Sequence, residues 1–316
     1  MRKLLQTVTL ALAATLAALA ALAAPGMAQQ PVPAPAPANA AIVTAAAAAP
    51  VPHPALWKVS DKDTTIYLFG TVHALPAGVH WLSGPIESAL AASDQLVTEI
   101  PETDPAEMQA AMVSNAVLPA SENLRALLAP DDRAKFEAAL TGYGLPADAF
   151  DRFEPWWAAV ALTTLPLAKE GYSAENGVEE TIAAAARKLG KPRMGLETAA
   201  YQLSVFDGLP RDVQNSYLRE VIKGLPTIDE ELAGIVREWS AGNAAKLAQL
   251  LNADEDDPRM VAALLTNRNR MWSNWIKVRM KRPGTVFMAV GAGHLAGKDS
   301  VQDMLAKDGL VATRVQ

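Results

Sequence analysis

The chain has 316 residues, and its 28 lysines and arginines against 34 aspartates and glutamates give a formal net charge of −6 at neutral pH. A net negative charge without a basic cluster argues against a nucleic-acid partner, because such binding depends on neutralising phosphates. The chain has no cysteine, which excludes disulfides, cysteine-bound zinc and thiol catalysis, and 50% hydrophobic against 20% charged residues excludes a disordered chain.

Residues 1–28 follow the pattern of a secretory signal peptide. Two basic residues precede an apolar stretch over residues 4–24, and Gly26 and Ala28 are the small residues expected before a cleavage site. We therefore expect export across the inner membrane and a periplasmic protein. The alternative is an uncleaved N-terminal membrane anchor, because a membrane span needs only ~20 apolar residues.

Residues 29–55 are rich in proline and alanine, which predicts an extended linker with little buried surface. Residues 56–316 are long enough for one large domain with a hydrophobic core, and they contain no uninterrupted apolar segment of membrane length. We expect that the mature chain is not stably inserted in a membrane.

The domain has strand signals at both ends and a mostly helical middle. β-Branched and aromatic runs predict strands over residues 56–60, 64–70, 95–100, 193–197, 285–290 and 310–315. Helical periodicity predicts helices over residues 85–93, 177–189 and 300–307, and helical segments between residues 104 and 168 and between residues 198 and 282. The predicted fold is a single mixed α/β domain whose central sheet is formed by the N- and C-terminal strands.

The most informative motif is Gly-x-x-His, which occurs twice. Of the four histidines, His73 ends the motif that begins at Gly70, and His294 ends the motif that begins at Gly291. Each motif directly follows an apolar strand, so glycine permits a tight turn and histidine lies beyond the carboxyl end of the strand, where open α/β sheets bind ligands. Histidine there can bind a metal ion or transfer a proton, or each histidine can simply cap a loop.

Two glutamates near strand ends are candidate partners of these histidines. Glu99 comes late in the strand predicted over residues 95–100, where an exposed acid at the same sheet edge would meet both imidazoles. Glu197 has the same position in the strand predicted over residues 193–197. Two histidines and a carboxylate are a common metal-binding set, whereas a glutamate late in a strand also often marks only the exit to solvent.

The remaining histidines and a pair of tryptophans have simpler interpretations. His53 lies in the linker, and His80 fits a loop or packing position. Trp156 and Trp157 begin a helix and are expected in the core rather than at a ligand.

Two charged segments are weaker candidates. Arg268 and Arg270 can bind a substrate carboxylate or phosphate, but they also fit a solvated helix face. The acidic run over residues 254–257 lacks the glycine and spacing of an EF-hand and is expected to be a charged turn.

At these motifs the sequence resembles the TraB/GumN family, which includes the Tiki-type metalloproteases. The resemblance extends over most of the domain. It is carried by LWKVS, IYLFGTVHALP, LVTEI, GVEETIAAAARKLGKPRMGLET, RNRMW and FMAVGAGHLAGKDSVQDMLAKDGLVATRV. One departure is Glu179, where we expect aspartate after Gly-Val, and this substitution keeps the charge.

The resemblance implies an α/β fold in which both Gly-x-x-His motifs and a glutamate build one site. Carried over by position, it assigns His73, His294 and Glu99, with Glu197 and Arg268 as supporting residues. In the Tiki-type members this site is linked to peptidase activity with manganese or cobalt, and zinc is a further possibility here. Other relatives include an erythromycin esterase type and a haem-binding type.

The resulting hypothesis is an exported, metal-dependent hydrolase that acts on a peptide or a small molecule. His73 and His294 would bind the metal ion, Glu99 would be a third ligand or a general base, and Arg268 would orient substrate or stabilise negative charge. The alternative is a non-catalytic periplasmic ligand-binding or regulatory protein, or an accessory factor of the cell envelope, that uses the same pocket.

Overall fold

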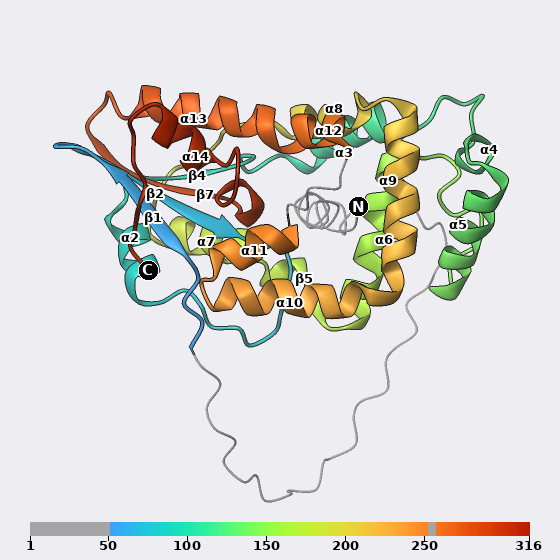
Figure 1. Cartoon of the computed structure of the whole chain (residues 1–316), viewed down its shortest axis with the longest axis horizontal. Helices are drawn as coiled ribbons and strands as arrows, with labels where there is room; N and C mark the ends of the chain where they lie inside the picture. The colour runs from blue at the N-terminus through green and yellow to red at the C-terminus, as the bar shows by residue number, and fades with distance from the viewer. Residues whose placement is uncertain (1–50, 252–256) are drawn as a thin grey trace, which may run out of the picture.

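The structure is a computed structural model that describes residues 51–251 and 257–316 (Figure 1). The predicted signal peptide, most of the linker and most of the acidic run over residues 254–257 lie outside the described residues. Among the residues described, no helix is both long and apolar enough to cross a bilayer.

A six-stranded mixed sheet organises the described domain. In spatial order it comprises β6 (Arg193–Gly195), β4 (Gln95–Thr98), β7 (Gly284–Gly291), β2 (Thr64–Thr71), β1 (Leu56–Ser60) and β8 (Thr313–Arg314). The first four strands are parallel to one another, whereas β1 is antiparallel to β2 and β8 is antiparallel to β1. The predicted α/β class and the sheet of N- and C-terminal strands are therefore confirmed.

Helices and short elements fill the rest of the chain. The α-helices are α2 (Gly84–Ala92), α3 (Pro105–Ala116), α4 (Leu124–Leu127), α5 (Pro130–Gly142), α6 (Pro155–Lys169), α7 (Val178–Lys188), α8 (Ala199–Asp207), α9 (Arg211–Gly224), α10 (Ile228–Ser240), α11 (Ala244–Leu251), α12 (Pro258–Val261), α13 (Asn267–Arg279) and α14 (Val301–Lys307). The other elements are the strand pair β3 (Leu75–Pro76) and β5 (Tyr172–Ser173), the 3₁₀-helices η1 (Ala174–Asn176), η2 (Leu225–Thr227) and η4 (Ala292–His294), and the π-helix η3 (Ala262–Thr266).

Several predicted strands are shorter in the structure. The strand expected over residues 95–100 ends at Thr98, and the one expected over residues 193–197 ends at Gly195. At Gly195 the chain is in close contact with the backbone and ring of Pro101, where a side chain would not fit. The strand expected over residues 310–315 is reduced to β8, an exposed edge strand.

Both faces of the sheet are buried, as expected for apolar parallel strands. Along β7, Phe287 and Ala289 pack in one hydrophobic cluster, and Val286, Met288 and Val290 pack in another. Figure 1 shows α13 and α14 on one side of the sheet and α7, α10 and α11 on the other. A third cluster lies among α3, α5, α6, α8 and α9, and it includes Trp156 and Trp157, so their core location is confirmed.

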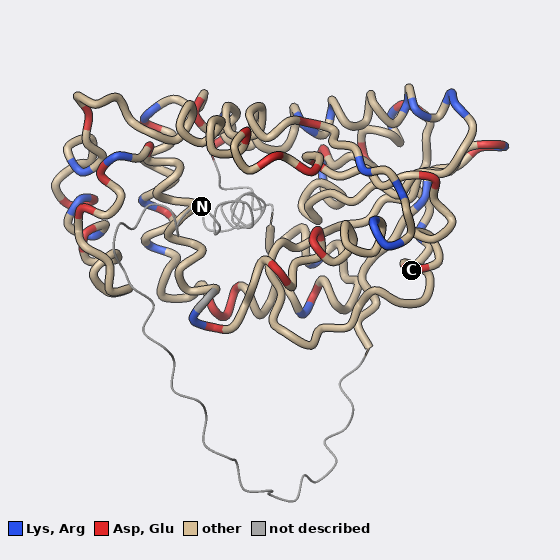
Figure 2. Tube along the Cα trace, turned by 180° about the vertical axis from the view of Figure 1, so that it is seen from behind, with Lys and Arg blue, Asp and Glu red and all other residues tan. Residues whose placement is uncertain are grey.

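Charged residues of both signs are interspersed along the described chain (Figure 2). Asp104 caps α3, because its side chain accepts hydrogen bonds from the backbone N–H groups of Ala106 and Glu107.

The start of α7 is in contact with the first Gly-x-x-His motif. The backbone N–H of Val178 donates to the carbonyl oxygen of Val72 over 3.0 Å. A Cβ atom added to Gly177 would lie 2.2 Å from the carbonyl oxygen of His73. Only glycine therefore allows α7 to approach the motif this closely.

We expect Gly177→Ala to destabilise the protein by about 3 kcal/mol, because the backbone must move to relieve the overlap. Gly142→Ala is the matched control, since a Cβ there meets no atom within 4 Å. The control should be neutral or slightly stabilising. Urea unfolding measures both, and equal midpoints would contradict this account.

Candidate functional site

Three adjacent parallel strands end at the same edge of the sheet. Thr71 at the end of β2 pairs with Gly291 at the end of β7, and Thr98 at the end of β4 pairs with Ala289. His73 and His294 follow β2 and β7, and Glu99 follows β4 directly. The register of the sheet thus brings together three of the residues singled out from the sequence.

The first glycine of each motif, where we expected a tight turn, allows close packing and does not have a positive φ. Gly291 has φ −48°, and neither motif glycine is among those with positive φ. A Cβ on Gly291 would lie 3.1 Å from Glu99 Oε1, and a Cβ on Gly70 would lie 3.1 Å from Ala292. The two glycines therefore let the motifs and Glu99 approach one another.

Arg268, near the start of α13, is the centre of a buried ionic network. Its Nε and Nη2 groups donate to both oxygens of Glu197, and Nη2 also donates to Glu99 Oε2 over 2.7 Å. Its Nη1 group donates to the carbonyl oxygen of Leu264 over 3.2 Å and lies 3.3 Å from His294 Nε2. These partners are enough to use all five N–H groups of the guanidinium.

The two carboxylates have further donors that hold them in place. Glu99 Oε1 accepts from the backbone N–H of Gly291 over 2.7 Å, and Glu99 Oε2 accepts from Gln202 over 2.8 Å. Glu197 accepts from Trp272 Nε1 over 3.0 Å and from Gln202 over 3.1 Å. Glu99 is only 7% exposed, so the expectation of an exposed acid at this edge is wrong.

The network keeps Glu99 and Arg268 ionised. Burial alone would raise the pKa of Glu99, but the charge of Arg268 and then the two histidines lower it to about 2. Burial alone would lower the pKa of Arg268, but Glu99 and Glu197 raise it above its ordinary value.

His294 is neutral at physiological pH. Burial and then the charge of Arg268 lower its pKa to about 3. Its Nδ1 atom lies 2.6 Å from Asn269 Oδ1. A neutral buried imidazole is the form that binds metal ions.

His73 has a different environment. Its Nδ1 atom lies 2.8 Å from Glu179 Oε1 at the start of α7, and its Nε2 atom is buried with no hydrogen-bond partner among the described residues. Burial lowers the pKa of His73, but the charge and hydrogen bond of Glu179 outweigh this effect and raise the pKa overall. Glu179, the residue at the departure from the family pattern, thus reaches the first motif.

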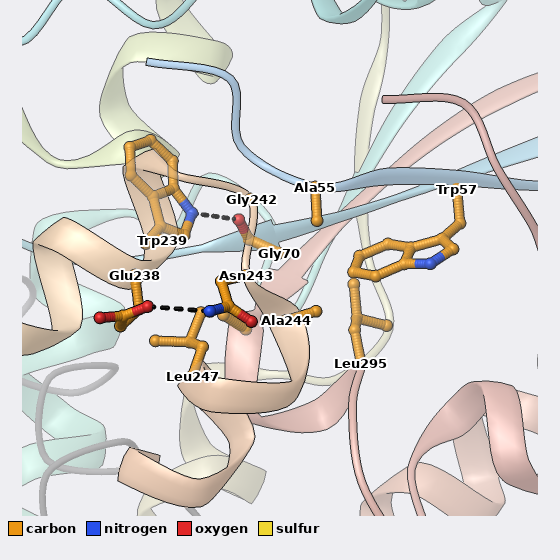
Figure 3. Close-up of a pocket in the computed structure, with 11 residues that line it drawn as sticks. Ala55, Trp57, Gly70, Glu238, Trp239, Gly242, Asn243, Ala244, Leu247 and Leu295 are labelled. Carbon is orange, nitrogen blue, oxygen red and sulfur yellow. Dashed lines mark hydrogen bonds between the residues drawn. The ribbon is translucent and has the colours of Figure 1, made fainter. Parts of the chain in front are cut away.

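A pocket lies beside the backbone of both motifs (Figure 3). Gly70 and Ala292 line it together with residues of α10 and α11. Trp239 Nε1 donates to the carbonyl oxygen of Gly70 over 2.8 Å, and this bond fixes the turn of the first motif from outside the ionic network.

The other sequence candidates lie away from this network. His53 and His80 are exposed in loops, and Arg270 is exposed with its guanidinium on Asn267. Asp257, the described end of the acidic run, caps α12 by accepting from the N–H of Arg259.

Sequence reasoning missed four polar residues that hold the site together. They are Glu179, Gln202, Asn269 and Trp272. Helical periodicity offered one signal, because Arg268 is four residues before Trp272 and therefore shares its buried face. Gln202 and Asn269 carry no comparable signal in the sequence.

A sequence model of the TraB/PrgY/gumN family matches residues 55–314, which include both Gly-x-x-His motifs. The chain belongs to this family. The resemblance drawn from the motifs is thereby confirmed.

Two relatives illustrate how far the similarity to this TraB/PrgY/gumN protein extends. The uncharacterised protein YbaP of Escherichia coli (strain K12) is 26% identical over 253 residues, which cover 76% of this chain and 87% of YbaP. An uncharacterised protein of Treponema pallidum (strain Nichols) is 22% identical over 270 residues, or 79% of this chain and 80% of that protein. No solved structure matches the chain.

Arg268→Met should destabilise the protein by about 3–5 kcal/mol, because it leaves two buried carboxylates without their cation. Arg270→Met is the matched control on the same helix, since Arg270 is exposed, and it should change stability by less than about 0.5 kcal/mol. Chemical unfolding of both variants measures the difference. Similar losses in the two variants would show that the network contributes little.

Stability of the metal-free protein should fall as the pH is lowered below 6.5. Folding lowers the pKa of His294 from 6.5 to about 3, so the unfolded chain binds a proton there more readily than the folded protein does. The stability of the folded protein is therefore highest above pH 6.5 with respect to this group, and it decreases between pH 6.5 and 3. Folding lowers the pKa of Glu99 from 4.5 to about 2, which adds a further loss below pH 4.5. The slope from one such group is at most about 1.4 kcal/mol per pH unit.

Unfolding by urea at pH 7.5, 6.0 and 5.0 measures this dependence, with His294→Gln as the variant that cannot titrate. We expect the wild type to lose more stability than the variant over this range. The same slope in both proteins would rule out a neutral, buried His294.

Proposed function

We propose that this protein is a metal-dependent hydrolase, with a metal ion bound by His73 and His294 and with Glu99 as a third ligand or general base. The observation that carries the proposal is the state of the two histidines. The Nδ1 atom of His73 lies within hydrogen-bond distance of an oxygen of Glu179, and the Nδ1 atom of His294 lies within hydrogen-bond distance of the oxygen of Asn269. Metal-binding histidines commonly have this arrangement, in which the second nitrogen is left for the metal ion.

The charge of the site also favours a cation. Glu99 and Glu197 are buried with one guanidinium, that of Arg268, between them. This leaves one negative charge in excess, and buried charge is stable only when it is compensated. A divalent ion with imidazole and carboxylate ligands, such as manganese, cobalt or zinc, fits this donor set.

Binding of such an ion requires Arg268 to move. No group of three or more His, Asp or Glu side chains in the described part of the chain is arranged to hold a metal ion. Arg268 contacts both Glu99 Oε2 and His294 Nε2, two of the proposed ligand atoms. An ion held by His73, His294 and Glu99 would therefore replace at least the contact between Arg268 and His294.

The residues around the ion would divide the remaining work of hydrolysis. A bound divalent ion polarises a carbonyl group and activates water. Glu99 is ionised in the site and would be the third ligand, or would accept a proton once the contact with Arg268, which lowers its pKa, is weakened. Arg268, once released from His294, retains Glu197 as its anchor and can direct Nη1 toward negative charge on a peptide or other acyl substrate.

We further propose that the protein acts in the periplasm after export. The basic start, apolar stretch and small residues of the segment over residues 1–28 support this location.

Metal retention tests the proposal directly. The purified protein is loaded separately with Mn²⁺, Co²⁺ and Zn²⁺, dialysed, and analysed for bound metal. We expect about one equivalent of one of these ions, and loss of retention in the His73→Ala/His294→Ala double variant, because two of its ligands are gone. The control is His53→Ala/His80→Ala, which removes the two exposed histidines and should retain metal.

A peptide library is then screened with the loaded protein. Metal-dependent cleavage that is absent from the His73→Ala/His294→Ala variant is the expected result. Equal metal retention by the two double variants, or no retention by the wild type, would contradict the proposed metal site.

The competing proposal is that the site of His73, His294 and Glu99 has a non-catalytic role in ligand binding or regulation. The observation in its favour is that Arg268 already pairs with both Glu99 and Glu197 and has partners for all its N–H groups. Tight binding of a peptide or haem-like ligand without turnover at any metal loading would support it.

A further inference from the structure

Asn269 connects His294 to a backbone carbonyl group of the loop before α14. Its Oδ1 atom lies 2.6 Å from His294 Nδ1, and its Nδ2 group donates to the carbonyl oxygen of Asp299 over 2.9 Å. A carbonyl oxygen can only accept, so the Asp299 carbonyl determines which end of the amide faces it. The oxygen of Asn269 must therefore face the imidazole.

This orientation decides where the proton of His294 lies. An amide oxygen accepts and does not donate, so His294 Nδ1 carries the hydrogen and Nε2 carries the lone pair. Arg268 agrees with this assignment, because Nη1 lies 3.3 Å from His294 Nε2 and can only donate to it. Two independent neighbours thus require the same tautomer.

Asp299 has a backbone conformation that supports this arrangement. Among the described residues, Asp299 is the one that has a positive φ, 56°, without being a glycine. L-residues rarely adopt this conformation. Its N–H donates to Asp303 Oδ2 over 2.9 Å, and Lys307 pairs with both aspartates. An uncommon backbone conformation is kept where the surrounding contacts hold it in place. Here the conformation of Asp299 places its carbonyl group within hydrogen-bond distance of Asn269.

We propose that Asn269, oriented by the Asp299 carbonyl, is a positioning residue that holds His294 as the Nδ1–H tautomer with its Nε2 lone pair directed into the site. Only the use of that lone pair, as a metal ligand, rests on the proposed function. Glu179 has the corresponding relation to Nδ1 of His73. In both histidines Nδ1 faces an oxygen and Nε2 lies on the other side of the ring.

The test is the ¹⁵N NMR spectrum of the metal-free protein with labelled histidine at neutral pH. The chain has four histidines, so single substitutions assign the signals. In the wild type we expect His294 to show a protonated Nδ1 and an unprotonated Nε2. A protonated Nε2 in the wild type overturns the proposal, and the tautomer itself is read from the wild-type spectrum.

Variants then separate positioning from general structure. Asn269→Ala removes the acceptor of Nδ1–H while Arg268 still faces Nε2. We therefore expect a measurable fraction of the Nε2–H tautomer of His294 to appear beside the Nδ1–H form. Asn269→Asp keeps an acceptor for Nδ1–H and should restore the wild-type pattern. Arg270→Met, at an exposed position next to Asn269 on the same helix, is the control that should leave the tautomer unchanged. An unchanged tautomer in Asn269→Ala contradicts the role of Asn269.

Metal titration of the same proteins distinguishes this inference from the proposed function. If both are right, Asn269→Ala lowers the affinity for the retained ion by about 10–100-fold, and Asn269→Asp recovers part of it. The expected tautomer in a wild type that retains no metal supports the positioning role and counts against the metal site. An Nε2–H tautomer in a wild type that does bind metal overturns the positioning role alone.

Discussion

The parallel pairing of β2 with β7 is the constraint on which the site depends. It joins residues more than 200 positions apart, from Thr64 with Gly284 to Thr71 with Gly291, and so fixes the two Gly-x-x-His motifs side by side. A shift of one residue would turn every side chain of a strand to the other face. Because both faces of the sheet are buried, such a shift is costly, and the hydrophobic core therefore maintains the geometry of the polar site.

The charges of the site follow from this burial. Two carboxylates are buried, and a single guanidinium on α13 forms an ion pair with each of them. The same guanidinium contacts His294, so a ligand that enters the site must exchange contacts with Arg268. Arg268 is therefore the internal counter-ion of the site and the side chain that links its carboxylates to His294.

The histidines come from the ends of the strands, but their partners come from helices on both sides of the sheet. Glu179 is in the first turn of α7, and Asn269 is in the first turn of α13. Gly177 allows the start of α7 to approach the first motif closely. The sheet thus fixes where the imidazoles lie, and the helices fix which nitrogen of each is available.

The sequence by itself determined the class of fold and the main strands and helices, because apolar periodicity is a local pattern. Its motifs also singled out His73, His294, Glu99, Glu197 and Arg268, which the structure brings together. It did not determine that Glu99 is buried, that Arg268 bridges two carboxylates, or that Glu179 and Asn269 hold the histidines. These features depend on contacts between segments far apart in the chain, which no local pattern encodes. Only the packing of α7 and α13 against the ends of the strands decided the partners, and hence the charge and tautomer, of the groups in the site.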